Sequence, residues 1–408
     1  MSQPAPRIAP DEQHFINREL SLLQFQRRVL AQAADPTVPL LERLRFICIV
    51  SSNLDEFFEV RVAGIKEQMR LFTRGTDRDG LKPTELNERV SREVHVIIAE
   101  QYALLNEVIL PALEAEGIRF LRRSEWTDAQ RHWIAEFFER QVLPVLTPIG
   151  LDPAHPFPRL LNKSLNFAVE LEGRDAFGRS SGTAIVQAPR TLPRVIQLPA
   201  EITGVDHGFV FLSSILHAHV GDLFSGMTVR GCYQFRVTRN SDLFVDEEEV
   251  KDLRVTLKGE LHQRHFGDAV RLEVADNCSE QMIAFLLQQF GLTRADLYQT
   301  PGIVNLVRLI QVPDRVNRPD LKYQPFEPGL PPALERKASL FEILREQDVL
   351  LHHPFQSFSP VIELIKAAAD DPRPFPAAAA ALAQTEATKE RVALKEVPQA
   401  VVRLACTS

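Results

Sequence analysis

The stretch from Ser51 to Phe58, Ser-Ser-Asn-Leu-Asp-Glu-Phe-Phe, places anion-binding groups at a predicted helix start. Asn53 is predicted to accept a hydrogen bond from the first turn, and Glu56 to reach back to the Asn53 amide, which together form a capping box. The positive end of the helix dipole, beside the serine hydroxyls, would then suit a phosphate. Because capping boxes are common, spacing alone favours a plain helix cap over a phosphate site.

Two histidine pairs are the next side chains whose spacing could do chemistry. His217 and His219 alternate as on a strand and could bind a metal, but without a nearby cysteine a structural role is favoured. His352 and His353 follow a predicted strand, where side chains of α/β domains commonly line a ligand crevice. A nucleophile or base there is one interpretation, and a structural role is again the favoured one.

Charged runs and glycine motifs add little to the search for a phosphate site. A proline-rich connector carries three basic residues, Arg315, Arg318 and Lys322. They could contact a polyanion, but the default interpretation is a solvated linker. The acidic run at residues 246–249 is expected to be a solvated loop and helix start. The sequence has no G-x-x-x-x-G-K-[ST] loop and no G-x-G-x-x-G turn, which argues against a P-loop or Rossmann nucleotide site.

Composition indicates a globular protein of two or three domains, because 408 residues are too many for one core. The chain is 45% hydrophobic and 25% charged, and its net charge of −7 argues against a protein coated in basic residues for nucleic acid. Its four cysteines are far apart with no C-x-x-C pair, so neither a zinc site nor a disulfide scaffold is expected, and a reducing, cytosolic location fits. We find no signal peptide and no apolar run long enough to span a membrane.

The elements that must position these groups are helical in the first third of the chain. In the first predicted helix Leu22, Phe25, Val29 and Leu30 face inward. This first helix begins with a capping box at 21–24 and ends at 35–36. A second helix is predicted to begin at Pro39 and a third at Asn53. After a turn at 74–80, a long helix is predicted from Thr84 to Gly117.

From Trp126 onward the pattern changes to a mixed α+β domain. A helix from Thr127 to about Val142 and a proline-rich loop at 144–158 precede predicted strands at 165–171, 228–237 and 269–274 and a helix capped by Ser279. A third unit contains a short helix at 341–345, a buried strand at 348–351 and a helix at 360–369, the opening of a βα unit that is not completed.

Several long motifs stand in one order along the chain. They are Phe-Ile-Asn-Arg-Glu-Leu-Ser at 15–21, Pro-Leu-Leu-Glu-Arg-Leu at 39–44, residues 51–58 with Val-Arg-Val at 60–62, Leu-Thr-Pro at 146–148, Asp-Pro-Ala-His-Pro-Phe-Pro at 152–158, Phe-Arg-Val-Thr-Arg at 235–239, Arg-Pro-Asp-Leu-Lys-Tyr at 318–323 and Leu-Leu-His-His-Pro-Phe at 350–355. In their order and spacing these motifs resemble the long bacterial polyphosphate kinases, and the resemblance covers roughly residues 14–372.

The resemblance implies an enzyme that moves the terminal phosphate of ATP reversibly to and from polyphosphate through a phosphohistidine. It implies a helical N-terminal domain (1–120), an α+β head domain (121–325) and the incomplete start of a phospholipase D-like α/β domain (326–372), followed here by a divergent tail (373–408). The asparagine of the family's S-[SN]-N-L-D-E-F motif contacts ATP and corresponds to Asn53. ATP, Mg²⁺ and inorganic polyphosphate are therefore the expected ligands of a homo-oligomer that is cytoplasmic or peripheral to the inner membrane.

After Asp371-Pro372 the chain departs from the family pattern, and no histidine follows His353. The family's phosphohistidine, metal-binding arginines and remaining ATP pocket therefore have no counterpart, so we expect no catalytic and no metal-binding residue in this chain. The tail fits a reading-frame change or a truncated gene, which re-sequencing would test. Three interpretations stay open: an enzyme that acts alone or with a complementing half, a non-catalytic nucleotide-binding or self-associating module, and a helical adaptor that needs no phosphate.

Overall fold

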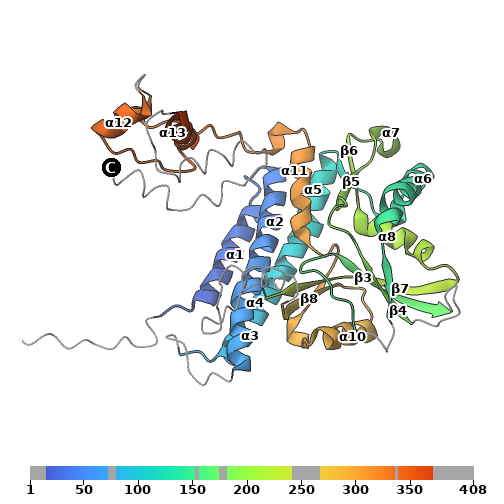
Figure 1. Ribbon diagram of the computed structural model, residues 1–408. Helices are drawn as coiled ribbons and strands as arrows, with labels where there is room; N and C mark the ends of the chain where they lie inside the picture. The colour runs from blue at the N-terminus through green and yellow to red at the C-terminus, as the bar shows by residue number, and fades with distance from the viewer. Residues whose placement is uncertain are drawn as a thin grey trace, which may run out of the picture. The chain divides into compact units, whose positions relative to one another are not determined.

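The computed structural model describes residues 15–71, 80–151, 156–173, 182–240, 267–335 and 339–370. They fall into two compact units, divided between Tyr323 and Gln324 (Figure 1). Most of the predicted turn at 74–80, the acidic run at 246–249 and the tail from residue 371 lie outside the described residues. The predicted α+β class is confirmed, with helices first and mixed sheets after them.

Two long helical stretches and α1 lie side by side in the first part of unit 1 (Figure 1). In each stretch a π-helical turn (η2 or η3) joins two α-helices without a break. The elements are α1 (Arg18–Ala34), then α2 (Leu40–Glu56), η2 (Phe57–Val62) and α3 (Ala63–Arg70), and then α4 (Pro83–Leu104), η3 (Leu105–Ile109) and α5 (Leu110–Ala115).

Helix α1 begins earlier than the predicted capping box at 21–24. Asn17 is its N-cap, and its Oδ1 accepts a hydrogen bond of 2.9 Å from the Leu20 N–H. The inward face is consequently shifted: Leu23 and Leu30 are buried, whereas Phe25, which was predicted to face inward, is exposed. The predicted starts at Pro39 and near Thr84, and the predicted end at Gly117, whose φ is +77°, are confirmed.

Six strands form the main sheet, in the order β2-β4-β3-β7-β8-β9, and a smaller sheet has the order β1-β6-β5. Neighbouring strands of the main sheet are antiparallel except for the parallel pair β8 and β9. The strands are β1 (Ile118–Phe120), β2 (Pro148–Gly150), β3 (Asn166–Gly173), β4 (Thr183–Gln187), β5 (Val195–Gln197), β6 (His207–Phe211), β7 (Met227–Arg239), β8 (Ala269–Ala275) and β9 (Leu297–Thr300).

The predicted strands at 165–171, 228–237 and 269–274 are confirmed as β3, β7 and β8, and part of the loop predicted at 144–158 is instead strand β2. The helix predicted from Thr127 is also confirmed, with a capping box between Thr127 and Gln130. The remaining helices among the described residues of unit 1 are α6 (Asp128–Phe137), η5 (Phe138–Val142), α7 (Ala200–Thr203), α8 (Leu212–His219), α10 (Glu280–Phe290), α11 (Val312–Arg315) and the short 3₁₀ segments η4 (Arg123–Glu125), η6 (Leu143–Val145), η7 (Val220–Leu223), η8 (Arg294–Asp296), η9 (Leu306–Gln311) and η10 (Pro319–Leu321).

The two faces of the main sheet are covered differently. Ser279 caps α10 as predicted, and the apolar residues of α10 pack on one face, for example Ile283 against Phe235 and Leu272. The largest core cluster joins the long helices to the strand region, since Leu44 and Val94 share it with Val270 of β8 and Tyr298 of β9. The helical part and the sheet part of unit 1 are therefore joined by one shared apolar cluster, beside two further clusters that lie in the sheet part.

Unit 2 contains η11 (Pro332–Leu334), α12 (Leu340–Glu346) and α13 (Ser359–Asp370), and both predicted helices of this region are confirmed. The strand predicted at 348–351 is wrong: the segment is irregular, and Leu350 is 86% exposed. A lone strand has no neighbour to complete its backbone hydrogen bonds. Within the described part of this unit the only ladder contact is one parallel bridge between Gly329 and Gln356.

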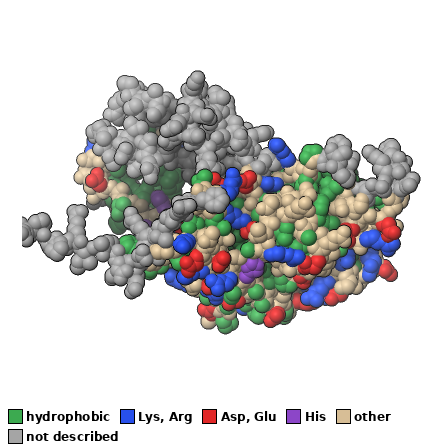
Figure 2. All heavy atoms as spheres, turned by 90° about the horizontal axis from the view of Figure 1, so that it is seen from below, with side chains coloured by type: hydrophobic (Ala, Val, Ile, Leu, Met, Phe, Trp, Pro, Cys, Tyr) green, Lys and Arg blue, Asp and Glu red, His purple; other side chains and the backbone are tan. Residues whose placement is uncertain are grey.

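One helical stretch, residues 83–115, is long and apolar enough for a membrane span by length and composition alone, contrary to the sequence expectation. Its Val90, Val94 and Ile97 lie in the largest core cluster, and core helices of globular proteins commonly meet the same criterion. On the face shown in Figure 2, acidic and basic side chains are intermixed.

Candidate functional site

Asn53 lies in the last turn of α2, so the predicted helix start at this residue is wrong. The chain continues through η2 into α3, and the Phe57 N–H donates to the carbonyl oxygens of Asn53 and Leu54. No proline interrupts residues 40–70, so the local capping pattern is overridden by a helix that began at Pro39. Asn53 therefore has no free N–H groups of a first turn beside it, and the dipole argument for a phosphate does not apply.

The motif instead turns Asn53 away from Ser51 and Asp55. Residues two apart on a helix are turned by about 200° from one another, whereas residues four apart differ by only about 40° and share a face. Asn53 is half-buried, and its Nδ2 donates to Gln26 Oε1 of α1 at 2.8 Å. Ser51 accepts a hydrogen bond from Gln101 Nε2 of α4 at 2.9 Å, and Asp55 faces the main sheet. The motif thus ties α2 to two helices and a sheet.

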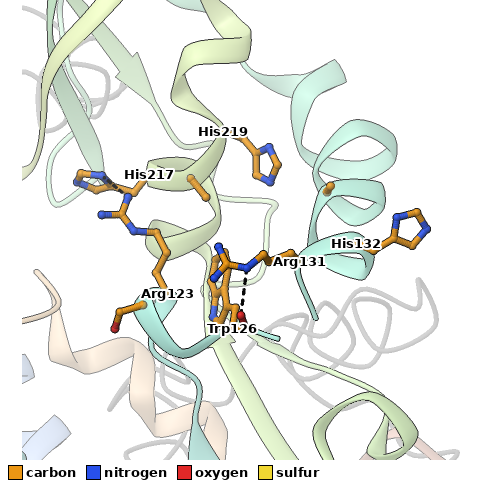
Figure 3. A pocket seen from close by; sticks show the side chains of 9 residues that line it. Arg123, Trp126, Arg131, His132, His217 and His219 are labelled. Atoms are coloured by element: carbon orange, nitrogen blue, oxygen red, sulfur yellow. Dashed lines mark hydrogen bonds between the residues drawn. The ribbon is translucent and has the colours of Figure 1, made fainter. Parts of the chain in front are cut away.

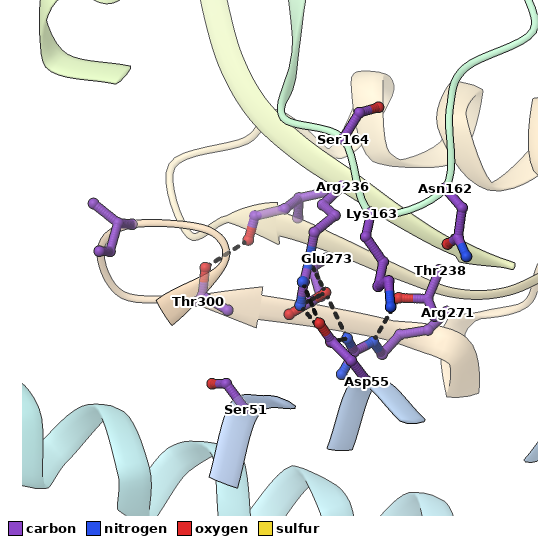
Figure 4. Close-up of polar contacts among 12 residues, drawn as sticks. Ser51, Asp55, Asn162, Lys163, Ser164, Arg236, Thr238, Arg271, Glu273 and Thr300 are labelled. Carbon is purple, nitrogen blue, oxygen red and sulfur yellow. Dashed lines mark hydrogen bonds and ion pairs between the residues drawn. The ribbon is translucent and has the colours of Figure 1, made fainter. Parts of the chain in front are cut away.

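Asp55 belongs to a buried ion cluster with Arg236 of β7 and with Arg271 and Glu273 of β8 (Figure 4). Arg236 donates from Nη1 and Nη2 to the two Asp55 oxygens at 2.8 and 2.9 Å, and from Nε to Glu273 at 2.6 Å. Arg271 also contacts both carboxylates, and its guanidinium lies 4.4 Å from the centre of the Phe58 ring. None of the four side chains is more than 9% exposed.

The charges of this cluster balance, because two carboxylates face two guanidinium groups. Burial by itself raises the pKa of Asp55, but Arg236 and Arg271 outweigh burial and hold the pKa below its ordinary value. Burial likewise opposes ionisation of Arg236, and the two carboxylates raise its pKa above the ordinary value. Buried ion pairs of this kind are stable only while every partner is present.

A second polar group extends the contact between helix and sheet. Glu59 of η2 accepts hydrogen bonds from Lys163 Nζ at 2.7 Å and from Asn162 Nδ2 at 2.6 Å. The space beside the main cluster is only about 10 Å³, which holds at most one water molecule. Because its charges are already paired and no ligand fits, we conclude that the cluster joins the helices to the sheet and does not act as a reaction centre.

The His217 and His219 pair lies on α8, so the predicted strand spacing is wrong. Both residues line a hollow of about 900 Å³, in which their side chains point apart (Figure 3). His217 Nδ1 lies 3.2 Å from Arg123 Nη1, and burial, then Arg123, lowers the pKa of His217. His219 Nδ1 lies 3.0 Å from Asp222 Oδ2. The described residues contain no group of three side chains that could hold a metal ion.

His352 and His353 do not follow a strand, and both are exposed. His353 Nδ1 lies 2.9 Å from the Gln356 carbonyl oxygen, and the His352 ring packs on Phe355. No carboxylate hydrogen-bonds to either ring among the described residues of unit 2. Nothing in this part of the structure activates either imidazole as a nucleophile or base.

The basic residues of the proline connector are engaged in unit 1 and are not a solvated linker. Arg315 donates to the Val195 carbonyl oxygen at 2.7 Å, and Lys322 Nζ to that of Val316 at 2.7 Å. Arg318 pairs with Asp320 and Glu116, both at 2.7 Å.

Three of the four cysteines, Cys48, Cys232 and Cys278, are buried free thiols, and burial raises the pKa of each to about 12. Cys406 lies outside the described residues.

A cleft of about 620 Å³ was missed by sequence reasoning. Its lining includes Tyr102, Arg122 and Arg123, and at one end it shares Phe211 and Gln234 with a narrow recess. The recess, of about 30 Å³, is also lined by Arg194, Asn305 and Arg308. The residues that line the cleft and the recess are spread over more than 100 positions of the sequence and form no motif, so no local sequence pattern predicts this site.

Three family models match consecutive parts of the chain. The polyphosphate kinase N-terminal domain matches residues 15–121, the middle domain residues 129–312, and C-terminal domain 1 residues 339–382. The last match extends beyond residue 372, where the resemblance was expected to end.

Curated relatives agree. A polyphosphate kinase of Neisseria meningitidis is 60% identical over 363 residues, which is 89% of this chain and 53% of the relative. Those of Burkholderia multivorans and Pseudomonas putida are 56% and 54% identical, over 88% and 89% of this chain and 52% and 50% of the relatives. The chain spans about half the length of the curated relatives it matches.

A solved structure has the same fold. The crystal structure of polyphosphate kinase from Porphyromonas gingivalis matches with a TM-score of 0.70 at 26% identity, over 88% of this chain and 50% of that one. By its three family matches and its relatives, this chain belongs to the polyphosphate kinase family.

Proposed function

We propose that this chain takes part in the reversible transfer of the terminal phosphate of ATP to polyphosphate. The observation that carries the proposal is 60% identity to a polyphosphate kinase over 363 residues. We further propose that the chain works in the cytoplasm as a homo-oligomer, free or peripheral to the inner membrane, with domain limits near residues 120, 325 and 372.

Asn53 is the residue for which we propose a contact with ATP. Its amide is half-buried on the side of α2 that faces α1, where Gln26 holds its Nδ2. Its Oδ1 makes no hydrogen bond within the described residues, so it is free to accept one from an amine such as that of adenine. This role relies on side-chain chemistry, since the helix end once expected at Asn53 does not exist.

Two elements of the family reaction are not assigned to residues of this chain. The exposed His352 and His353 have no acid partner among the described residues, so neither is proposed as the phosphohistidine. The described residues that could bind Mg²⁺ do not gather in one group, so no step is derived through that ion.

The test of the nucleotide contact is calorimetric titration of the chain with ATP. Asn53→Ala is expected to weaken binding about tenfold, the effect of losing one or two hydrogen bonds. Asn87→Ala is the control, because Asn87 is also a half-buried asparagine within a helix, in α4. Equal ATP affinity in the wild type and Asn53→Ala would remove Asn53 from the proposal.

Incubation with γ-labelled ATP and Mg²⁺ tests the reaction itself. Labelled polyphosphate or a labelled protein would establish that the chain is active alone. If neither product forms while ATP still binds, the result would favour the second candidate, a nucleotide-binding and self-associating module without catalysis. The absence of an acid partner for His352 and His353 among the described residues also favours this candidate. Sedimentation over a range of protein concentrations then tests self-association.

A further inference from the structure

We propose that the recess lined by Arg194 and Arg308 binds the terminal phosphate of a linear phosphate chain, at a site separate from the nucleotide contact of Asn53. The identity of the chain as polyphosphate rests on the proposed function, whereas the anion site itself rests on the following contacts.

Polar atoms without partners gather in this recess. Arg194 is only 8% exposed, and its Nη2 donates to the Ala188 carbonyl oxygen at 3.0 Å, but its Nη1 has no partner. Gln234 Oε1 and Asn305 Oδ1 are also buried without one. Among the described residues, three of the five buried side-chain atoms that lack a partner thus lie in one small recess. A buried polar group normally has a partner, because leaving it unpaired destabilises the fold.

The recess also contains positive charge that no acid neutralises. Among the described residues, Arg194 and Arg308 make no ion pair with a carboxylate, in contrast to Arg236 and Arg271 of the buried cluster. Burial, then the charges of Arg308 and Arg190, lower the pKa of Arg194 to about 10. Burial, then Arg190 and Arg236, lower that of Arg308, and Asp55 opposes this only in part. An anion would relieve this repulsion.

The shape of the recess suits one end of a longer anion. Its volume of about 30 Å³ matches one water-sized group, such as a terminal phosphate oxygen. Its outer end shares Phe211, Ser213, Gln234, Ile303 and Leu309 with the 620 Å³ cleft, which has room for further phosphate groups. Arg122 and Arg123 line that cleft together with Glu114 and Asp276, so its cations and carboxylates balance, and the excess of positive charge lies in the recess itself.

The two amides are compatible with an anion. Turning either the Gln234 or the Asn305 amide by 180° exchanges its oxygen and nitrogen and presents two N–H donors to the recess. Without such a turn, one of the two amide oxygens can accept the single P–OH hydrogen bond of a monoprotonated terminal phosphate. Guanidinium groups are the preferred protein donors to phosphate, and they bind it in a bidentate manner.

Arg308→Gln is the decisive variant, because Arg308 is only half-buried and makes no side-chain hydrogen bond among the described residues. Tripolyphosphate is the probe, measured by calorimetry and by the shift in melting temperature. The wild-type chain is expected to bind it, and Arg308→Gln to bind at least about tenfold more weakly. Arg230→Gln, which removes an exposed arginine of β7, should bind as the wild type does.

The ligand-free melting temperature separates a binding role from a structural one. If Arg308 serves the fold, its replacement lowers the melting temperature. If it is held among like charges for a ligand, Arg308→Gln melts at or above the wild-type temperature and loses the stabilisation by tripolyphosphate. A lower ligand-free melting temperature with unchanged affinity would overturn the proposal, as would no binding to the wild type, which would mean that the recess holds only water.

Two further arms identify the ligand and separate this proposal from the nucleotide contact. Orthophosphate that binds as tightly as tripolyphosphate would overturn the chain-end assignment, whereas much weaker orthophosphate binding supports it. Asn53→Ala should leave tripolyphosphate binding unchanged. The two sites are independent if Asn53→Ala loses binding of ATP but keeps binding of tripolyphosphate, while Arg308→Gln loses binding of tripolyphosphate but keeps binding of ATP. If Arg308→Gln loses binding of both ligands, the separation of the two sites is overturned.

Discussion

Replacing Asp55 by asparagine is predicted to lower the free energy of unfolding by about 3–5 kcal/mol, the range for removing one member of a buried ion group. Asparagine has nearly the same shape, so the change tests charge and not volume. The substitution leaves two guanidinium ions, Arg236 and Arg271, facing the single carboxylate of Glu273.

The magnitude follows from burial and geometry. The two arginine side chains are each 2% exposed, so water cannot replace the lost carboxylate. Asp55 accepts three hydrogen bonds from them, and asparagine has one oxygen to offer. At an effective dielectric constant of about 20, one unit charge 4 Å away contributes about 4 kcal/mol, which agrees with the range above.

Urea denaturation monitored by circular dichroism measures the change in the free energy of unfolding. The dependence of this free energy on urea concentration should be the same in the variant and the wild type. The matched control is Glu172→Gln, which also removes one carboxylate facing an arginine, Arg230, but in a pair whose side chains are 62% and 63% exposed. The control should cost less than about 1 kcal/mol. A loss below about 1 kcal/mol in Asp55→Asn, or an equal loss in the control, would refute the assignment of the cluster as the joint between helices and sheet.

Three further predictions use other features of the chain. Because the folded-state pKa of Asp55 is depressed, its stabilisation is complete above the ordinary pKa of about 3.9 and is lost as pH falls through the lower folded value, so melting curves of wild type and Asp55→Asn should converge in acid. In a Cys406→Ser chain at pH 8, Cys48 and the other two buried thiols should react with a thiol reagent slowly in the native state and completely in urea, and fast native labelling would contradict their burial. Gly291→Ala, at a residue with φ +63° after α10, should lower the free energy of unfolding by about 1 kcal/mol. Gly64→Ala, at a residue within α3 that has open space around it, should raise the free energy of unfolding by about 0.5–1 kcal/mol. A change of the same sign in both variants would contradict this conformational argument.

Local capping patterns predicted several helices well but failed where the chain had a stronger continuation. Thr127 and Ser279 cap their helices as predicted, because each follows a segment that is not helical. The same pattern at Asn53 lies inside a helix already in progress, whose propagation adds a hydrogen bond with every residue. The strand at 348–351 failed for lack of a neighbour, which no local pattern can reveal.

The ion cluster was beyond sequence reasoning for a different reason. Arg236 and Thr238 in β7, and Arg271 and Glu273 in β8, alternate with apolar residues, and such alternation is typical of a strand with one face in water. Here the polar face is buried against the long helices, because its charges satisfy one another and Asp55. Only the tertiary arrangement distinguishes the two cases. The arginines of the recess were missed likewise, since Arg194 lies in the irregular segment before β5 and Arg308 lies far along the chain in η9.

The apolar cluster and the ion cluster that the long helices share with the strands limit which segments of this protein can be exchanged with those of a relative. The family boundary falls between residues 121 and 129, yet Asp55 lies before it and its partners Arg236 and Arg271 lie after it. A chimera that joins segments of distant relatives at this boundary would combine a helical surface from one protein with a sheet surface from another, and the two surfaces would not have evolved together. We expect such hybrids to succeed only when the carboxylate and its two guanidinium partners travel as one set, so the unit of exchange in evolution is larger than the unit of family classification.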